Sequence, residues 1–223
     1  MTCKLRICHI SDIHIRSLQR HSEQRIVFQS LINQARELGT DYFFIGGDIW
    51  HTKVSGLSSE YISLLSELLK GLAEIAPVRM MLGNHDFSQA NTTRLDAISP
   101  IIDLLNDPRI ILYKHSGVYK LEPGVNLAVF SLWDEDRWDI VKPVTGEYNI
   151  ACYHGSVRGA KTEGGWELTD GITTDFFEQY DAVFLGDIHK PQFLGYRDYE
   201  RVVDEEDLKN YPDAEILEWL DDD

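Results

Sequence analysis

The chain has 223 residues, 43% of them hydrophobic, which is enough to bury the core of a single globular domain. Its formal net charge of −16 at pH 7 argues against a protein that holds nucleic acid through its own basic surface, because neutralised phosphates supply most of that affinity. No apolar run reaches the length of about 18 residues that a membrane span requires, so no membrane contact is expected. The N-terminus also lacks the layout of a signal peptide.

The three cysteines lie in or beside apolar, strand-like runs, and their spacing matches no zinc module. We interpret Cys3, Cys8 and Cys152 as reduced residues rather than as a disulfide framework. This interpretation predicts an intracellular, cytoplasmic protein, since disulfides persist mainly in oxidising compartments.

The first part of the chain alternates strand-like and helix-like runs. The expected strands span residues 4–10, 41–45 and 77–82. An amphipathic helix is expected from Ser22, as its N-cap, to about Leu38, where Gly39 ends it. A second helix is expected over residues 58–73. This alternation predicts a mostly parallel sheet with helices packed on it.

Short strands dominate the middle of the chain. They are expected at residues 110–113, 117–121 and 125–132, and the turn residues between them predict an antiparallel meander. Two more strands are expected at residues 148–153 and 181–185.

The composition changes near the C-terminus. Beyond about Arg197 the chain becomes charged and loses strand character. We therefore expect one compact domain over residues 1–196. An acidic tail with a short helix near Asp213–Leu220 is expected over residues 197–223.

Polar side chains follow five of the expected strands, at the point where each strand ends. These residues are Asp12 and His14, Asp48, Asn84 and His85, His154, and Asp187 and His189. Each group alone has an ordinary interpretation as a turn, a cap or a strand end. Their recurrence at five strand ends argues against coincidence, because α/β proteins place ligands at the carboxyl ends of strands.

The residue types favour divalent metal ions. Carboxylate and amide oxygens together with imidazole nitrogens suit manganese, iron, zinc or magnesium. With this many ligands, two ions sharing one bridging aspartate is the expected arrangement. Two such ions clamp phosphoryl oxygens and turn a water into a nucleophile. A neighbouring histidine would then protonate the leaving oxygen.

The motifs resemble those of calcineurin-like metallophosphoesterases in their usual order. They are Asp12-Ile13-His14, Gly47-Asp48-Ile49-Trp50-His51, Gly83-Asn84-His85-Asp86, His154-Gly155 and Gly186-Asp187-Ile188-His189. The longer run from Gly186 to Gln192 is similar to SbcD-type DNA-repair nucleases and their phage or viral relatives. The resemblance implies an α/β fold with two packed mixed sheets flanked by helices, a four-layer sandwich.

The resemblance also implies a division of the ligands. One metal would be bound by Asp12, His14 and His189, the second by Asn84 and His154, with Asp48 bridging. Asp187 departs from the family pattern, which usually has histidine there. We expect its carboxylate to coordinate the second metal, and this would favour manganese or magnesium over zinc. The alternative is that Asp187 points away and the second metal is weak or lost.

Three further residues are assigned to catalysis by the resemblance. His85 would be the acid that protonates the leaving group, and Asp86 would orient it. His51 would lie near the scissile phosphate. Separately, Trp166 lies in a glycine-bounded loop and has two interpretations, a base-stacking platform or an anchor for its own loop.

The function that the resemblance implies is a metal-dependent DNA nuclease, an exonuclease or endonuclease, acting in repair or recombination with two metal ions, manganese being favoured. A coiled-coil ATPase of the SbcC type would be its partner, and a homodimer is also compatible. One alternative is a phosphatase or cyclic-nucleotide phosphodiesterase on the same fold. Another is a scaffold that has lost catalysis.

Overall fold

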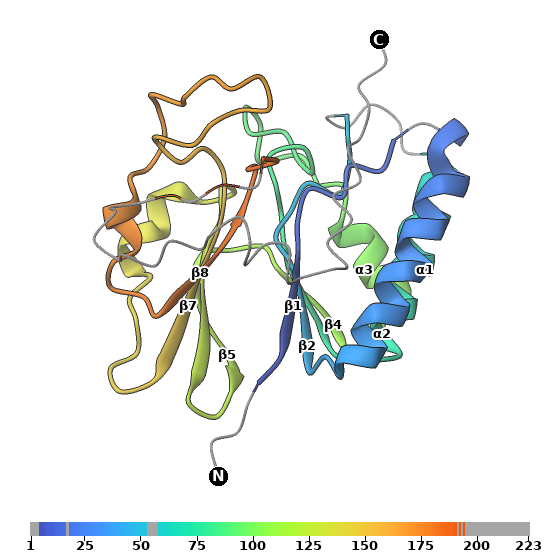
Figure 1. Ribbon diagram of the computed structural model, residues 1–223, viewed down its shortest axis with the longest axis horizontal. Helices are drawn as coiled ribbons and strands as arrows, with labels where there is room; N and C mark the ends of the chain where they lie inside the picture. The colour runs from blue at the N-terminus through green and yellow to red at the C-terminus, as the bar shows by residue number, and fades with distance from the viewer. Residues whose placement is uncertain (1–4, 17, 53–57, 191, 193, 195–223) are drawn as a thin grey trace, which may run out of the picture. The chain divides into compact units, whose positions relative to one another are not determined.

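The computed structural model describes residues 5–16, 18–52, 58–190, 192 and 194 (Figure 1). Eight strands in these residues form two four-stranded sheets, with orders β1-β2-β3-β4 and β5-β6-β7-β8. The expected α/β fold with two sheets and flanking helices is therefore confirmed. One compact unit covers residues 1–192. The expected boundary after residue 196 and the tail helix near Asp213–Leu220 lie outside the described residues.

The first sheet is parallel throughout its described strands. Its strands are β1 Ile7–Ile10, β2 Tyr42–Ile45, β3 Val78–Met81 and β4 Ile110–Tyr113. The expected antiparallel meander beginning at residue 110 is wrong for β4, which pairs in parallel with β3. A seven-residue helix, α3 Ser99–Leu105, crosses between these two strands. A parallel pair requires such a crossover, and this helix is too short to show a clear apolar period.

The second sheet is mixed. Its strands are β5 Gly117–Glu122, β6 Val125–Phe130, β7 Tyr148–His154 and β8 Ala182–Gly186. The first two form an antiparallel hairpin, whereas β6, β7 and β8 run in parallel. The strands β1, β2, β3, β7 and β8 all end at or shortly before expected site residues.

Two long helices cover the first sheet. Helix α1 spans His21–Leu38 and α2 spans Ser59–Ala73. The expected N-cap at Ser22 is wrong, because the helix begins one residue earlier, directly after the 3-10 turn Leu18–Arg20. The buried stripe of α2 consists of Leu64, Leu65, Leu68, Leu69 and Leu72, and it packs in one core with the buried residues of α1 and α3. Figure 1 shows the three helices along one side of β1–β4.

Alternate residues of the first sheet face two different cores. Phe43 and Ile45 of β2 lie in the core beneath the helices, whereas Phe44 packs against Val129 and Cys152 of the second sheet. This alternation follows from the two-residue period of a strand. The described cysteines, Cys8 and Cys152, are both free thiols, and burial raises the pKa of each. The sheets thus pack face to face through an apolar layer.

The outer face of the second sheet is covered differently. Phe130 contacts an aromatic group formed by Trp138, Phe176, Phe177 and Tyr180. These residues come from or adjoin the 3-10 helices Glu135–Ile140 and Thr174–Phe177. Among the described helices, none combines the length and apolar content needed to cross a membrane.

Candidate metal centre

The expected site residues meet at the carboxyl ends of the parallel strands. Asp12 and His14 follow β1, Asp48 follows β2, Asn84 and His85 follow β3, His154 ends β7, and Asp187 and His189 follow β8. Their acidic and imidazole groups form three clusters with ligand atoms within 4.8 Å of one another. The clusters are Asp12–His14–His189, His14–Asp48–His85 and Asp12–Asp48–His154. Residues far apart in sequence are therefore brought to one place.

The backbone at this edge adopts an uncommon conformation. Asp12, His14, Asp48 and Asp187 all have positive φ angles, of 55°, 46°, 52° and 67°. Non-glycine residues rarely adopt this left-handed region unless the surrounding structure holds them there. Hydrogen bonds between the first two loops supply part of that support, since Asp12 N–H donates to the Gly47 carbonyl at 3.1 Å and His14 N–H to that of Asp48 at 3.0 Å. Strained backbone of this kind is concentrated at functional sites.

Close packing at Gly83 holds the second and third loops together. A Cβ atom at this position would collide with the backbone nitrogen and the carboxylate of Asp48, and would come within 2.8 Å of the His154 ring. Only glycine fits here without displacing one of these groups. The glycine of the third motif is therefore required by the approach of Asp48.

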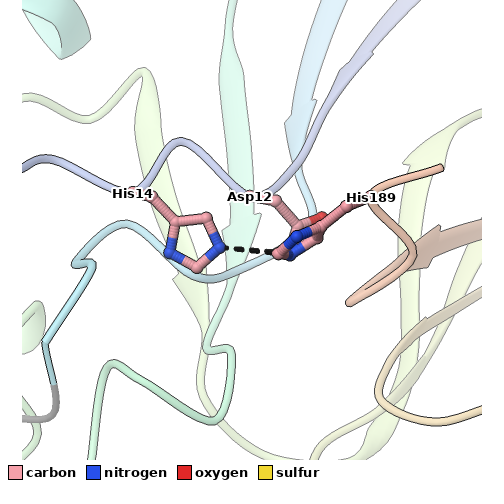
Figure 2. A group of neighbouring side chains, drawn as sticks. All are labelled: Asp12, His14 and His189. Atoms are coloured by element: carbon pink, nitrogen blue, oxygen red, sulfur yellow. Dashed lines mark hydrogen bonds and ion pairs between the residues drawn. The ribbon is translucent and has the colours of Figure 1, made fainter. Parts of the chain in front are cut away.

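His14 and His189 face one another across one end of the centre. Their Nε2 atoms lie 3.3 Å apart, and Asp12 Oδ1 lies 3.6 Å from His189 Nε2 and 3.9 Å from His14 Nε2 (Figure 2). The three side chains come from two different sheets. Their ligand atoms converge on one point, as binding of a single ion requires.

Asp48 lies between the two ends of the centre and is almost fully buried. Its Oδ1 accepts the backbone N–H of His85 at 2.9 Å and lies 3.2 Å from His154 Nε2. Its Oδ2 lies 3.9 Å from His14 Nε2 and 4.0 Å from His85 Nε2. The two oxygens therefore face different imidazole nitrogens, an arrangement that a bridging carboxylate can use.

In the described part of the chain, four buried side-chain atoms of the expected ligands have no hydrogen-bond partner. They are His14 Nδ1, Asp48 Oδ2, Asn84 Oδ1 and His154 Nε2, the last of which lies 3.2 Å from Asp48 Oδ1 without forming a hydrogen bond. Burying such atoms without partners is costly, and native structures seldom do so. Among them, the amide oxygen, the carboxylate oxygen and the His154 nitrogen suit a divalent ion. The residues present therefore fit the metal that their chemistry implies.

Hydrogen bonds behind three histidines turn their Nε2 atoms toward the centre. His154 Nδ1 lies 2.7 Å from the Gly46 carbonyl, and His85 Nδ1 lies 2.7 Å from the His51 carbonyl. A carbonyl accepts only, so each Nδ1 carries a proton. His189 Nδ1 is held in the same way by Glu163 Oε1 at 3.2 Å. Such contacts fix the tautomer and leave Nε2 to act as ligand or acid.

Without a metal, two histidines of the centre, His154 and His189, are favoured in the protonated form, whereas burial lowers the pKa of His14. Burial lowers the pKa of His154, but the adjacent Asp48 carboxylate outweighs it and raises that pKa to about 9. Asp12, followed by Glu163, raises the pKa of His189 to about 9 against the effect of burial. Burial itself raises the pKa of Asp187. A bound cation would replace these protons, because only neutral imidazole coordinates a metal.

Asp86, expected to orient His85, forms no hydrogen bond with the His85 ring in the described residues. Asp86 is fully buried, and its carboxylate accepts the backbone N–H groups of Gly83 at 2.8 Å, Ile49 at 2.9 Å and Trp50 at 3.3 Å. It therefore ties the loop after β2 to the loop after β3. The ring of His85 is instead held by the His51 carbonyl.

His51 and Asp187 lie at the edge of the centre. His51 is exposed, and its ring centroid lies 5.6 Å from that of His14. The backbone N–H of Asp187 donates to both carboxylate oxygens of Asp12, at 3.1 and 3.2 Å. In the described residues, the Asp187 carboxylate belongs to none of the three clusters. The backbone N–H of Asp187 thus contacts Asp12 of the centre, and, besides burial, the charges of His154, Asp48 and Asp12 act on the pKa of its carboxyl group.

Glu163 is a contact that the sequence pattern did not reveal. It lies 26 residues before His189 in a loop with no recognisable motif, and its side chain is 63% exposed. An exposed glutamate beside two glycines is typical of an ordinary surface loop. Only the fold brings it to His189.

Comparison with known proteins identifies the family. The sequence matches the calcineurin-like phosphoesterase family over residues 5–191. The chain belongs to the calcineurin-like phosphoesterases. Their fold marks the chain as a hydrolase, and the family depends on a pair of metal ions for which the three clusters hold candidate ligands.

Two curated proteins are similar to this phosphoesterase. Uncharacterized protein R555 of Acanthamoeba polyphaga mimivirus is 36% identical over 203 residues, which cover 84% of this chain and 15% of R555. The DNA double-strand break repair protein Mre11 of Halobacterium salinarum is 27% identical over 195 residues, which cover 83% of this chain and 47% of Mre11. The chain thus spans less than half the length of either relative.

A solved structure is also similar. The crystal structure of Pseudomonas putida nuclease MPE matches 73% of this phosphoesterase and 66% of its own chain. The TM-score is 0.41 and the sequence identity is 17%.

Proposed function

We propose that this phosphoesterase is a metal-dependent nuclease that hydrolyses phosphodiester bonds of DNA in repair or recombination. The proposal that DNA is the substrate is supported by the similarity to Mre11 and by the SbcD-like run from Gly186 to Gln192. The hydrolytic part rests on one observation above all. Asp48, Asn84 and His154 carry buried ligand atoms that have no hydrogen-bond partner among the described residues.

In this proposal two divalent ions, preferably manganese, occupy the centre. One would be held by Asp12, His14 and His189 and the other by Asn84 and His154, with Asp48 between them. Bound ions would supply positive charge for the phosphoryl oxygens and lower the pKa of an attacking water. They would also offset the two carboxylates of Asp12 and Asp48, which would otherwise repel an anionic phosphodiester.

In this proposal His85 protonates the leaving oxygen. The His51 carbonyl keeps a proton on Nδ1, so the proton that His85 can give up is the one on Nε2. Nε2 lies 4.0 Å from Asp48 Oδ2, and the side chain is 28% exposed, so a substrate oxygen can reach it. Asp86 acts indirectly, by holding the loop that carries His85.

The acidity of the chain makes a partner part of the proposal. A net charge of −16 gives DNA little general attraction to this protein. A coiled-coil ATPase of the SbcC type would supply the missing basic surface, in a complex built on one copy or on a homodimer of this chain.

The test is a substrate comparison with purified protein and manganese. Single-stranded and duplex DNA oligomers, a cyclic nucleotide and a phosphomonoester are assayed side by side, with and without the ATPase partner. We expect cleavage of at least one DNA substrate, and its loss when manganese is chelated. Hydrolysis of the phosphomonoester or cyclic nucleotide without DNA cleavage would identify a phosphatase or a cyclic-nucleotide phosphodiesterase instead. No hydrolysis of any substrate, with an unbound centre, would indicate a scaffold.

A further inference from the structure

The segment between β7 and β8 contains an ordered hairpin, residues 161–167. Lys161 and Glu167 form an antiparallel bridge, and Thr162 N–H donates to the Trp166 carbonyl at 2.9 Å. The turn closes through Gly165 N–H and the Thr162 carbonyl, also at 2.9 Å, with Gly165 at a φ of 82°. Nothing in the proposed hydrolysis requires a hairpin in this position.

Two contacts attach the hairpin to the segment that carries His189. Glu163 contacts His189 Nδ1, as described above. The side-chain amide of Gln192 then pairs with both backbone groups of Lys161. Its Oε1 accepts the Lys161 N–H at 2.6 Å, and its Nε2 donates to the Lys161 carbonyl at 2.9 Å. The glutamine at the end of the SbcD-like run therefore holds the hairpin beside the metal centre.

Trp166 projects from this hairpin. Its side chain is 80% exposed, more than that of any other large hydrophobic residue in the described part of the chain. The indole lies along Gly164, where a Cβ atom would meet it at 3.4 Å, and it pairs with no aromatic ring of the described residues. The high exposure of Trp166 favours the interpretation as a stacking platform over that as an anchor for its own loop. The indole remains free for an outside partner.

The position of Trp166 distinguishes it from other exposed apolar residues. Leu104 and Ile26 are also exposed, but they lie on the solvent faces of α3 and α1, and single exposed apolar residues are ordinary. Trp166 is three residues from Glu163, so their Cα atoms are at most about 11 Å apart. Glu163 in turn touches a histidine of the metal centre.

We propose that Trp166 stacks on an unpaired base of the DNA strand whose phosphodiester lies at the metal centre. This inference rests on the proposed nuclease function and adds a substrate class to it. A base inside a duplex has both faces covered, so only an unpaired or terminal base offers a face to the indole. Stacking on aromatic side chains holds single strands without sequence preference. The exposed Lys161 and Lys190, neither in an ion pair within the described residues, provide positive charge beside it.

The test measures binding and needs no cleavage. Fluorescence anisotropy with the full chain and its ATPase partner compares a labelled thymidine oligomer with an abasic oligomer of equal length. For Trp166→Ala we expect affinity for the thymidine oligomer to fall about 5- to 100-fold, the range for loss of one stacked base. Binding of the abasic oligomer should not change, because it has no base to lose. Trp166→Tyr should retain most of the affinity.

Leu104→Ala removes an equally exposed apolar side chain on α3 and serves as the matched control, for which no change is expected. The same discrimination between oligomers by wild type and Trp166→Ala would overturn the inference. So would a loss confined to binding of the ATPase, which would show that Trp166 contacts protein. If Trp166→Ala loses base-dependent binding while the wild type cleaves no DNA, the nuclease proposal fails and stacking stands. If the wild type cleaves DNA but binds the thymidine and abasic oligomers equally well, the stacking proposal fails and the nuclease proposal stands.

Discussion

The two sheets contribute to the metal centre in different ways. The loops after β1, β2 and β3 are tied together by backbone hydrogen bonds and by the buried carboxylate of Asp86. The second sheet offers His154, which is fully buried, and His189, whose side chain is 39% exposed and depends on Glu163 from a surface hairpin. Backbone contacts among buried groups fix geometry firmly, whereas a contact between exposed side chains is easily changed.

This difference suggests a division of labour. In the proposed function, the first sheet would provide the central aspartate and the acid on a rigid support. The second sheet would complete the ligand set and, through the hairpin at residues 161–167, connect it with the proposed contact to DNA. Variants in the two regions should therefore differ in what they lose.

The largest effect is expected for His85→Asn, which tests the loops that the first sheet holds in place. Loss of general-acid catalysis should lower kcat on DNA by about 10²- to 10⁴-fold with manganese binding retained. Hydrolysis of bis-p-nitrophenyl phosphate should fall much less, because p-nitrophenolate leaves without needing a proton. Steady-state kinetics on both substrates checks this.

The matched control for this variant is His115→Asn, which changes an exposed histidine bound to Asp134 away from the centre. Equal losses on DNA and on the nitrophenyl ester for His85→Asn would contradict the role of His85 as an acid.

Glu163→Gln tests the second sheet, where a contact between exposed side chains holds His189. The amide can no longer hold His189 Nδ1 as a charged acceptor, and loss of such a partner typically lowers metal affinity about 10- to 100-fold. Titration with manganese should show one weakened site and one unchanged site. Glu167→Gln in the same hairpin, which has no contact with His189, should bind both ions as the wild type does. Equal weakening of both ions by Glu163→Gln would remove the distinction between the two regions.

Asp86→Asn should affect stability before it affects binding. The amide would place a donor against backbone N–H groups that now share the Asp86 carboxylate. We expect the free energy of unfolding to fall by about 1–3 kcal/mol, the usual cost of an unsatisfied buried group. Denaturant unfolding measures this, with Asp103→Asn on the exposed side of α3 as control. An unchanged unfolding midpoint would mean that Asp86 does not hold these loops.

The smallest expected effect is the release of protons when manganese binds. Because the pKa values of His154 and His189 are raised to about 9 in the metal-free protein, both carry a proton at pH 7. Manganese binding should release about two protons, and affinity should rise with pH until about 9. Calorimetry in buffers of different ionisation enthalpy measures the release. A pH-independent affinity between 6 and 9 would contradict the raised pKa values.

Much of the centre could be predicted from sequence, because each ligand directly follows a strand. The apolar runs that end at Ile10, Ile45 and Leu82 identify the strands, and parallel strands bring their carboxyl ends to one edge. The ligands therefore needed no knowledge of long-range pairing.

The remaining features depend on tertiary contacts. The pairing of β4 with β3 follows from a helix too short for a periodic signal. Two partners of Asp86 are the backbone N–H groups of Ile49 and Trp50, which lie 37 and 36 residues away along the chain, and nothing in the spacing of side chains indicates them. Glu163 and Gln192 act only because the hairpin folds back on the segment after β8.

The most direct test of the account is the anomalous scattering of a crystal soaked in manganese. The account predicts two manganese peaks on either side of the Asp48 carboxylate, roughly 3.5–4 Å apart. One should contact Asp12, His14 and His189, and the other Asn84 and His154. A single peak, or no peak within reach of Asp48, would contradict it.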